Sequence, residues 1–299
     1  MELGLRGLGR MGMGIARRLA RAGHRVVAFD RKVEWMAEAR EAGVVTAASV
    51  EEIATSLSPP RAVWLMVPEG KPVEDMIALL LPRLASGDIL IDGGNSYYKD
   101  SMRRAQGLEP RGISFVDVGT SGGIWGEREG FCLMIGGEKE AVERLRPIFE
   151  SLAPREGWLH AGPSGAGHFV KMVHNGVEYG MMQAYAEGFE LMAASEFGLD
   201  LARVAHLWDH GGVVRSWLLE LAEAALTKNP DLSGIVPYVE DSGEGRWTVH
   251  ECVDRGVPAG VIALSLFNRF RSRQENSFAD RLLAALRNEF GGHAIKTKP

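Results

Sequence analysis

Short apolar runs alternate with segments of helical spacing along the first half of the chain. The runs cover residues 2–7, 25–30, 62–67, 88–92, 114–118 and 131–135. Their length suits buried strands, whereas apolar positions recur at helical intervals in residues 10–22 and 139–152. Strands that alternate with helices predict an α/β domain with a mainly parallel sheet, whose ligands bind at the carboxyl ends of the strands.

Helical spacing dominates the second half. The strand pattern stops at Gly162-Pro163-Ser164-Gly165, and one long helix is predicted from about Pro163 to Ala194. Further helices are predicted over 201–207, 214–226, 257–270 and 281–290. Because 299 residues are too many for one ordinary core, we expect two domains: residues 1–162, which bind a ligand at the sheet, and residues 163–299, an all-α domain for substrate binding and dimerisation, with a C-terminal tail.

A glycine motif follows the first predicted strand. It has the form G-x-G-x-x-G and opens the first helix. The first glycine permits a tight turn, the second lets a pyrophosphate approach, and the third lets helix and strand pack closely. In this context the motif predicts a Rossmann-type dinucleotide-binding domain. Its cofactor contacts are expected at Gly7, Leu8, Gly9, Arg10, Met11 and Gly12.

The second strand ends in Asp30, 18 residues after Gly12. A carboxylate at this place can bind the adenosine ribose hydroxyls, which favours NAD. Arg31 and Lys32 could instead hold a 2′-phosphate, so NADP stays open. Asp30 could also be the N-cap of the next helix. Val67 ends one later predicted strand and Asn95 follows another, and both are expected to line the same cofactor site.

Polar residues form a stripe on the long helix. Lys171, His174, Asn175 and Glu178 are spaced i, i+3, i+4 and i+7 and therefore share one face. A solvated face with a charge pair is the alternative. The rest of this helix is mostly small or apolar, as in a buried helix, with Gly176, Gly180, Met181, Met182, Ala184 and Ala186. A buried base and acid suit proton transfer near neutral pH, so the stripe is interpreted as the catalytic centre.

Three other features have less specific interpretations. Ser121-Gly122-Gly123 follows a strand and is either a plain turn or a turn that offers N–H groups to a carboxylate. The basic residues of 269–273 form either a solvated turn or a site for a phosphorylated substrate. Arg6 is unexpected within a parallel strand, where both faces are usually apolar, and the sequence offers no account of it.

Composition excludes several classes of protein. The net charge of −5 gives no electrostatic reason to expect nucleic acid. Cys132 and Cys252 stand alone, without metal-ligand spacing, which indicates a reducing compartment and no metal site. No apolar run has the length of a membrane span, and the first strand leaves no room for a signal peptide. We therefore expect a cytoplasmic protein.

Together these motifs resemble the 6-phosphogluconate dehydrogenase family in its shorter bacterial form, over nearly the whole chain. The most specific are Asp92-Gly-Gly-Asn95-Ser96, Ser121-Gly-Gly123, Lys171-x-x-His174-Asn175-Gly-x-Glu178-Tyr179, Gly245-Arg-Trp247-Thr248 and Arg287-Asn-Glu-Phe-Gly-Gly-His293. Related 3-hydroxyacid dehydrogenases share the Ser-Gly-Gly turn and a lysine with an asparagine four residues later. They lack the His-Asn pair followed by Glu-Tyr.

The resemblance implies oxidative decarboxylation of 6-phospho-D-gluconate to D-ribulose 5-phosphate, a step of the pentose phosphate pathway that needs no metal. It implies Lys171 as general base and Glu178 as general acid. His174 and Asn175 would orient the substrate's C3 oxygen. The other implied substrate contacts are Asn95, Ser121, Gly122 and Gly123 at the carboxylate, Tyr179 and Arg269 at the phosphate, and Arg287 and His293 from the tail of a neighbouring subunit in a homodimer or higher oligomer.

The chain departs from the family pattern at two places. Many members carry Asn-Arg-Thr where this chain has Asp30-Arg31-Lys32, which puts preference for NADP in doubt. Longer members carry a substrate-binding lysine shortly before the Gly-Lys-Trp sequence, and here only Arg246 is available. Two other functions remain as alternatives: a non-decarboxylating 3-hydroxyacid dehydrogenase, which needs Lys171 but not Glu178, and a non-catalytic dinucleotide-sensing protein.

Overall fold

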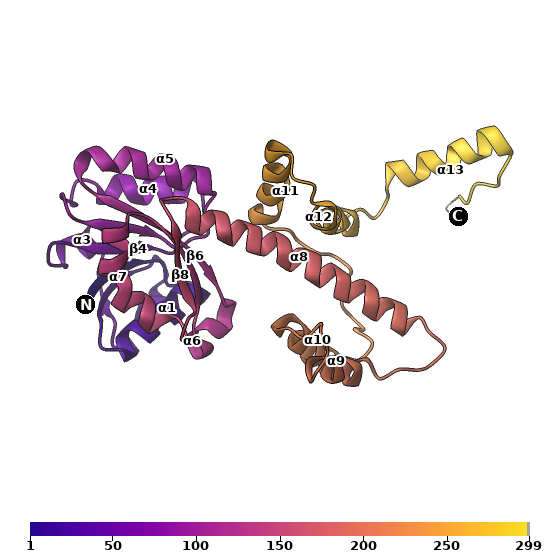
Figure 1. Cartoon of the computed structure of the whole chain (residues 1–299), viewed down its shortest axis with the longest axis horizontal. Coiled ribbons are helices and arrows are strands. Elements are labelled where there is room, and N and C mark those ends of the chain that lie inside the picture. The colour runs from indigo at the N-terminus through magenta and orange to yellow at the C-terminus, as the bar shows by residue number, and fades with distance from the viewer. Residues whose placement is uncertain (298–299) are drawn as a thin grey trace. The chain divides into compact units, whose positions relative to one another are not determined.

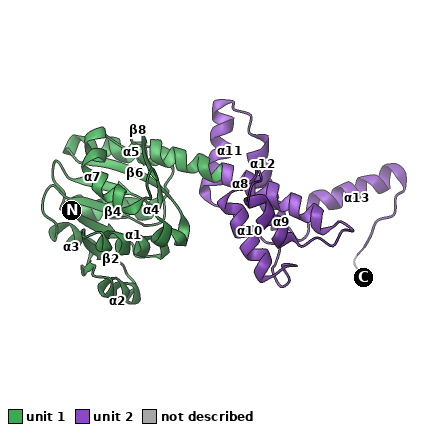
Figure 2. Ribbon diagram, turned by 60° about the horizontal axis from the view of Figure 1, so that its bottom comes forward, with its two compact units in different colours: residues 1–176 green, residues 177–299 purple. Residues whose placement is uncertain are grey.

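The computed structural model describes residues 1–297. The chain divides into two compact units, residues 1–176 and 177–299 (Figure 2). The first unit contains all eight strands of the sheet, and the second is helical. Helix α8 (Ala166–Ala193) begins in the first unit and ends in the second. An α/β Rossmann-type domain followed by an all-α region is therefore confirmed.

The sheet of the first unit (Figure 1) has the strand order β3-β2-β1-β4-β5-β6-β7-β8. Its strands are β1 (Glu2–Arg6), β2 (Arg25–Phe29), β3 (Val45–Thr46), β4 (Ala62–Leu65), β5 (Ile89–Asp92), β6 (Ser114–Ser121), β7 (Cys132–Gly136) and β8 (Trp158–Gly162). All neighbours pair in parallel except β6 and β7, which are antiparallel. The sequence pattern did not predict β3, which has two residues, or β8, whose residues are only partly buried or exposed.

Helices cover both faces of this sheet. They are α1 (Arg10–Arg21), α2 (Val33–Glu41), α3 (Val50–Thr55), α4 (Lys71–Leu80), α5 (Tyr98–Leu108), α6 (Gly126–Glu129) and α7 (Lys139–Leu152). Successive residues of a strand point to opposite faces. Trp64 of β4 accordingly joins the core beneath α1 and α7, whereas Val63 and Leu65 join the core beneath α3 and α4. Burial on both faces explains why the central strands read as continuous apolar runs.

The second unit contains α9 (Leu201–Asp209), α10 (Trp217–Lys228), α11 (Gly243–Arg255), α12 (Gly260–Ser272) and α13 (Phe278–Gly291). Helix α10 starts three residues later than predicted because Ser216 caps it, accepting a hydrogen bond from Leu219 N at 3.2 Å. Helix α11 was not predicted, since Gly243 and Gly245 weaken the helical pattern of its first turn. Among residues 1–297, no helix combines the length and apolarity that a membrane span requires.

Candidate active site

The glycine motif forms a cradle at the start of α1. A Cβ on Gly7, whose φ is +105°, would lie 2.2 Å from the Met66 carbonyl oxygen. A Cβ on Gly12 would lie 2.1 Å from the Gly7 carbonyl oxygen, so neither position accepts a side chain. Gly9 differs, because its added Cβ would meet only the Trp35 ring at 4.0 Å. Gly9 is the N-cap of α1 and has no side chain that could accept a hydrogen bond from the helix. The first N–H groups of α1 therefore remain available to a pyrophosphate, and the loop fits a dinucleotide.

Asp30 lies directly after β2, against this glycine loop. Its Oδ2 accepts a hydrogen bond from Leu8 N at 2.8 Å, and its Oδ1 accepts one from Lys32 N at 3.1 Å. The N-cap of α2 is Lys32, so the alternative that Asp30 caps this helix is wrong. Arg31 is exposed beside it. Arg6, the unexpected arginine of β1, forms an ion pair with Asp30.

The carboxyl ends of the next strands meet at the same edge of the sheet. Val67 follows β4, and an added Cβ on Gly94 would lie 2.2 Å from the Val67 carbonyl oxygen. Asn95 follows β5 and binds Thr120 of β6 twice: its Nδ2 donates to the Thr120 carbonyl at 3.2 Å, and its Oδ1 accepts from Thr120 N at 2.9 Å. The structure therefore brings Asn95 beside Ser121, the residue that follows Thr120.

Ser121 ends β6 and starts a glycine turn. Gly122 and Gly123 both adopt left-handed backbone conformations, with φ of +117° and +53°. Such a turn leaves backbone N–H groups directed away from the strand ladder, and these can bind a carboxylate. On the neighbouring strand, Cys132 lies opposite Ser121 in the β6–β7 register. Burial raises the pKa of the Cys132 thiol, and the positive charge of Lys171 opposes that shift.

The start of α8 is anchored to the sheet by a buried carboxylate. Asp117 of β6 accepts hydrogen bonds from Gly165 N at 2.6 Å and from His168 N at 2.8 Å. Gly167 has no room for a side chain, since its added Cβ would lie 2.4 Å from the Met134 carbonyl oxygen. A Cβ on Gly119 would lie 2.4 Å from the Lys171 Cβ, so helix and strand are in close contact at the predicted base.

Lys171 is buried, with 5% of its surface exposed. Its Nζ donates to Asn175 Oδ1 at 2.7 Å, and His174 Nδ1 lies 3.1 Å from the same oxygen. Three members of the predicted stripe are therefore joined through one amide oxygen. A solvated face with a charge pair, the alternative interpretation, does not hold for Lys171. Glu178 follows on the same helix, one turn beyond His174 and Asn175.

Tyr179 and Arg269, which are distant in sequence, lie together in the second unit. The Arg269 guanidinium carbon is 3.4 Å from the centroid of the Tyr179 ring, a cation–π contact. Tyr179 Oη accepts from Ser242 N at 2.6 Å and lies 2.9 Å from Ser242 Oγ. Sequence reasoning missed Ser242. A Cβ on Gly245 would lie 2.5 Å from the Tyr179 ring, which explains this glycine near the start of α11.

The other arginines near this pair are bound to Asp241. Arg246 Nε and Arg273 Nη1 each lie 2.5 Å from a carboxylate oxygen of Asp241. Hydrogen bonds from Arg246 and then Arg273 lower the pKa of the Asp241 carboxyl, although burial opposes the shift. The basic residues of 269–273 therefore have different partners: Arg269 contacts Tyr179, whereas the charge of Arg273 is neutralised by Asp241.

The predicted tail residues lie at the end of the second unit. Arg287 is on α13 and His293 follows it; this helix buries none of its side chains. Asn288 Nδ2 donates to the His293 carbonyl at 2.9 Å and closes the turn after the helix. The exposed residues Phe278, Leu283 and Phe290 give α13 an apolar surface.

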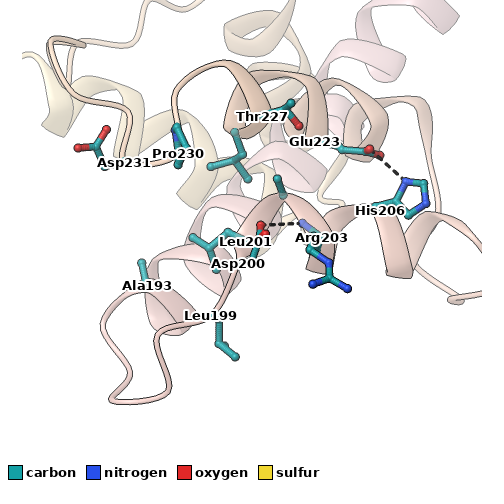
Figure 3. A pocket seen from close by; sticks show the side chains of 12 residues that line it. Ala193, Leu199, Asp200, Leu201, Arg203, His206, Glu223, Thr227, Pro230 and Asp231 are labelled. Atoms are coloured by element: carbon teal, nitrogen blue, oxygen red, sulfur yellow. Dashed lines mark hydrogen bonds and ion pairs between the residues drawn. The ribbon is translucent and has the colours of Figure 1, made fainter.

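A pocket of about 660 Å³ lies between α9 and α10 (Figure 3). Its polar contacts join the two helices or cap one of them: His206 Nδ1 is 3.1 Å from Glu223 Oε1, and Asp200 accepts from Arg203 N at 3.1 Å. None of the residues that line it belongs to the predicted site. The candidate active site is therefore assembled from the sheet edge and α8, not from this pocket.

Comparison with known proteins gives matches to both parts of the chain. A family model for the NAD binding domain of 6-phosphogluconate dehydrogenase matches residues 2–162, and one for the C-terminal domain of 6-phosphogluconate dehydrogenase matches residues 167–285. An NAD(+)-dependent, decarboxylating 6-phosphogluconate dehydrogenase of Haloferax volcanii is 45% identical over 300 residues, which cover 100% of this chain and 99% of that protein.

Longer relatives match over part of their length. The NADP(+)-dependent, decarboxylating 6-phosphogluconate dehydrogenase of Bacillus subtilis is 38% identical over 95% of this chain and 64% of its own length. The solved structure of Plasmodium falciparum 6-phosphogluconate dehydrogenase has a TM-score of 0.84 and 30% identity, covering 100% of this chain and 67% of that one. With a relative this similar over its full length and models matching both domains, the chain belongs to the 6-phosphogluconate dehydrogenase family.

Proposed function

We propose that this chain oxidises 6-phospho-D-gluconate with NAD and decarboxylates it to D-ribulose 5-phosphate and CO2. Family membership makes it a nicotinamide-dependent oxidoreductase. The observation that carries the proposal is the buried Lys171, whose Nζ is bound to Asn175 and whose helix is packed on β6. A buried amine packed on the same sheet that carries the glycine cradle suits a general base for the oxidation of a hydroxyl group.

The bound nicotinamide supplies the acceptor for the hydride that leaves C3 of the substrate. Lys171 takes the proton of the C3 hydroxyl in the same step, which leaves a ketone at C3. The resulting β-keto acid loses CO2, its electrons move to the C3 oxygen, and Lys171 returns the proton there. Glu178 then protonates C1 of the enediol, which is the carbon that carried the carboxylate in the substrate. The enediol hydroxyl proton returns to Lys171, which yields the ketose.

The remaining residues position the substrate. The N–H groups of Ser121-Gly122-Gly123 and the Asn95 side chain are proposed to hold the carboxylate that leaves as CO2. His174 and Asn175 orient the C3 oxygen. Tyr179 and Arg269, which are in contact in the second unit, are proposed to bind the phosphate, because a guanidinium group and a phenol can both donate to phosphate oxygens.

We further propose that the active protein is a homodimer or a higher homo-oligomer. The apolar side chains of α13 support this, since exposed apolar patches commonly mark interfaces. In this proposal Arg287 and His293 complete the substrate site of the neighbouring subunit. Residues 1–162 bind NAD, residues 163–299 bind substrate and the second subunit, and the enzyme works in the cytoplasm without a metal.

Initial rates with 6-phosphogluconate, measured with NAD and with NADP while released CO2 is trapped, test the proposal. We expect one CO2 for each coenzyme reduced. Coenzyme reduction without CO2 would indicate the non-decarboxylating 3-hydroxyacid dehydrogenase. Coenzyme binding without turnover of any hydroxyacid would indicate the dinucleotide-sensing protein.

Replacing Glu178 by Gln separates the two enzymatic alternatives. The decarboxylating enzyme loses its acid and should lose about 10²-fold or more in kcat. A non-decarboxylating dehydrogenase would keep most of its activity. Glu187→Gln is the matched control, because Glu187 is exposed on the same helix and is expected to leave kcat unchanged.

A further inference from the structure

Arg6 is a buried charge at the carboxyl end of β1. It is 6% exposed, pairs with Phe29 in the β1–β2 register, and its guanidinium carbon lies 5.3 Å from the Phe29 ring centroid. Its Nη1 lies 3.3 Å from the Phe29 carbonyl oxygen and 3.4 Å from Asp30 Oδ2. Its Nε has no hydrogen-bond partner among the described residues. Such a residue costs stability unless its charge is compensated, and Asp30 is the carboxylate that compensates it.

The pair changes what Asp30 presents to a ligand. The two Asp30 oxygens accept hydrogen bonds from Leu8 N of the glycine loop and from Lys32 N, while Arg6 approaches one of them. Oδ1 keeps a lone pair that can accept from a ribose hydroxyl, whereas the negative charge of the carboxylate is offset from within the protein. Burial lowers the pKa of the Arg6 guanidinium, Asp30 raises it, and the charge of Arg31 lowers it, so all three groups lie within electrostatic range of one another.

NAD and NADP differ only at the 2′ position of the adenosine ribose, and an acidic residue at the end of the second strand meets that position. An unpaired carboxylate there repels a 2′-phosphate. We infer that Arg6 is a coenzyme-specificity residue: by neutralising Asp30 it lets the site accept NADP in addition to NAD. Arg31, exposed beside Asp30, adds a second positive charge for the phosphate. The inference rests on the proposed use of a nicotinamide coenzyme.

Direct binding of NAD and NADP by titration calorimetry, without substrate, tests this. In Arg6→Met the aliphatic stem is largely kept and the charge is lost. We expect the ratio of the Kd for NADP to the Kd for NAD to rise about tenfold, the scale of one unit charge at the distance of a neighbouring side chain. Arg6→Lys keeps the charge and should change the ratio by less than about threefold.

The matched control is Arg25→Met. Arg25 is at the opposite end of β2 and also pairs with an acid of β1, its Nη1 lying 2.7 Å from Glu2 Oε1. This variant should leave the coenzyme ratio unchanged. A ratio that stays constant in a folded Arg6→Met protein, or an equal loss of affinity for both coenzymes, would show that Arg6 is only structural.

Asp30→Asn provides a second test that does not depend on the folding of Arg6→Met. It leaves the charge of Arg6 uncompensated, so the affinity for NADP should increase relative to NAD. When Arg6 is also replaced by Met, the increase in the affinity for NADP relative to NAD, compared with the wild type, should be about tenfold smaller than in Asp30→Asn alone. An Asp30→Asn protein with an unchanged preference would overturn the inference. Because the readout is coenzyme binding, failure to oxidise 6-phosphogluconate would refute the proposed function and leave this test intact.

Discussion

At the scale of single residues, the proposed chemistry depends on one buried amine. Lys171→Met removes the base while keeping a side chain of similar length, so kcat with 6-phosphogluconate should fall by about 10²- to 10⁴-fold. Binding of NAD, measured by calorimetry, should change by less than about threefold. Lys139→Met, an exposed lysine in the first turn of α7, is the control and should keep full activity. A Lys171→Met enzyme with normal kcat would show that another group is the base.

The proposed phosphate site is also testable with one residue. Arg269→Gln should raise the KM for 6-phosphogluconate about 10- to 100-fold, because a hydrogen bond to a charged group contributes about 1.5–3 kcal/mol. Turnover of gluconate, which has no phosphate, should not change. Arg271→Gln is the control on the same helix, since Arg271 is exposed and bound to Asp280. If Arg269→Gln impaired the turnover of 6-phosphogluconate and of gluconate equally, Arg269 would not be part of the phosphate-binding site.

At the scale of elements, the position of Lys171 depends on how closely α8 approaches the sheet. Gly167→Ala places a Cβ 2.4 Å from the Met134 carbonyl oxygen, in a contact with backbone atoms that cannot move freely. We expect a loss of about 1–3 kcal/mol in the free energy of unfolding and a lower kcat, because the helix must shift. Chemical denaturation and initial rates measure the two effects.

Gly107→Ala is the matched control for this prediction. Gly107 lies in α5, is exposed, and its added Cβ meets no atom within 4 Å. The change should be neutral or should stabilise the protein by up to about 1 kcal/mol, since alanine favours a helix over glycine. Similar destabilisation at both positions would mean that steric contact with the sheet is not the cause.

At the scale of the whole molecule, the proposed exchange of tails predicts complementation. Lys171→Met and Arg287→Gln should each be nearly inactive as homodimers. In a heterodimer of the two variants, one site receives Lys171 from one subunit and Arg287 from the other, and that site is intact. Co-expression followed by tandem affinity purification should therefore give about half of the wild-type activity per dimer, as one of two sites is restored. Heterodimers without activity would show that Arg287 acts within its own chain.

The local features of this protein were predictable from the order of its residues. The buried central strands, the long helix and the glycine motif depend on spacings of a few residues, and the structure confirms the α/β fold followed by helices. The helical stripe was predictable for the same reason, because helix geometry alone places Lys171 beside Asn175. Elements with weak sequence patterns were not predicted, because β3 is too short, β8 lies at the edge of the sheet, and glycines obscure the start of α11.

Contacts between distant residues were settled only by the tertiary structure. The parallel pairing of β1 with β2 places Arg6 beside Asp30 and gives the unexplained arginine a partner. Packing of α11 and α12 around Tyr179 brings Arg269 and Ser242 to one side chain, although no spacing in the sequence relates them. Periodicity specifies which face of an element is apolar, but it does not specify which polar residue of another element will meet it. That choice follows from strand order and helix packing, which depend on the burial of the whole core.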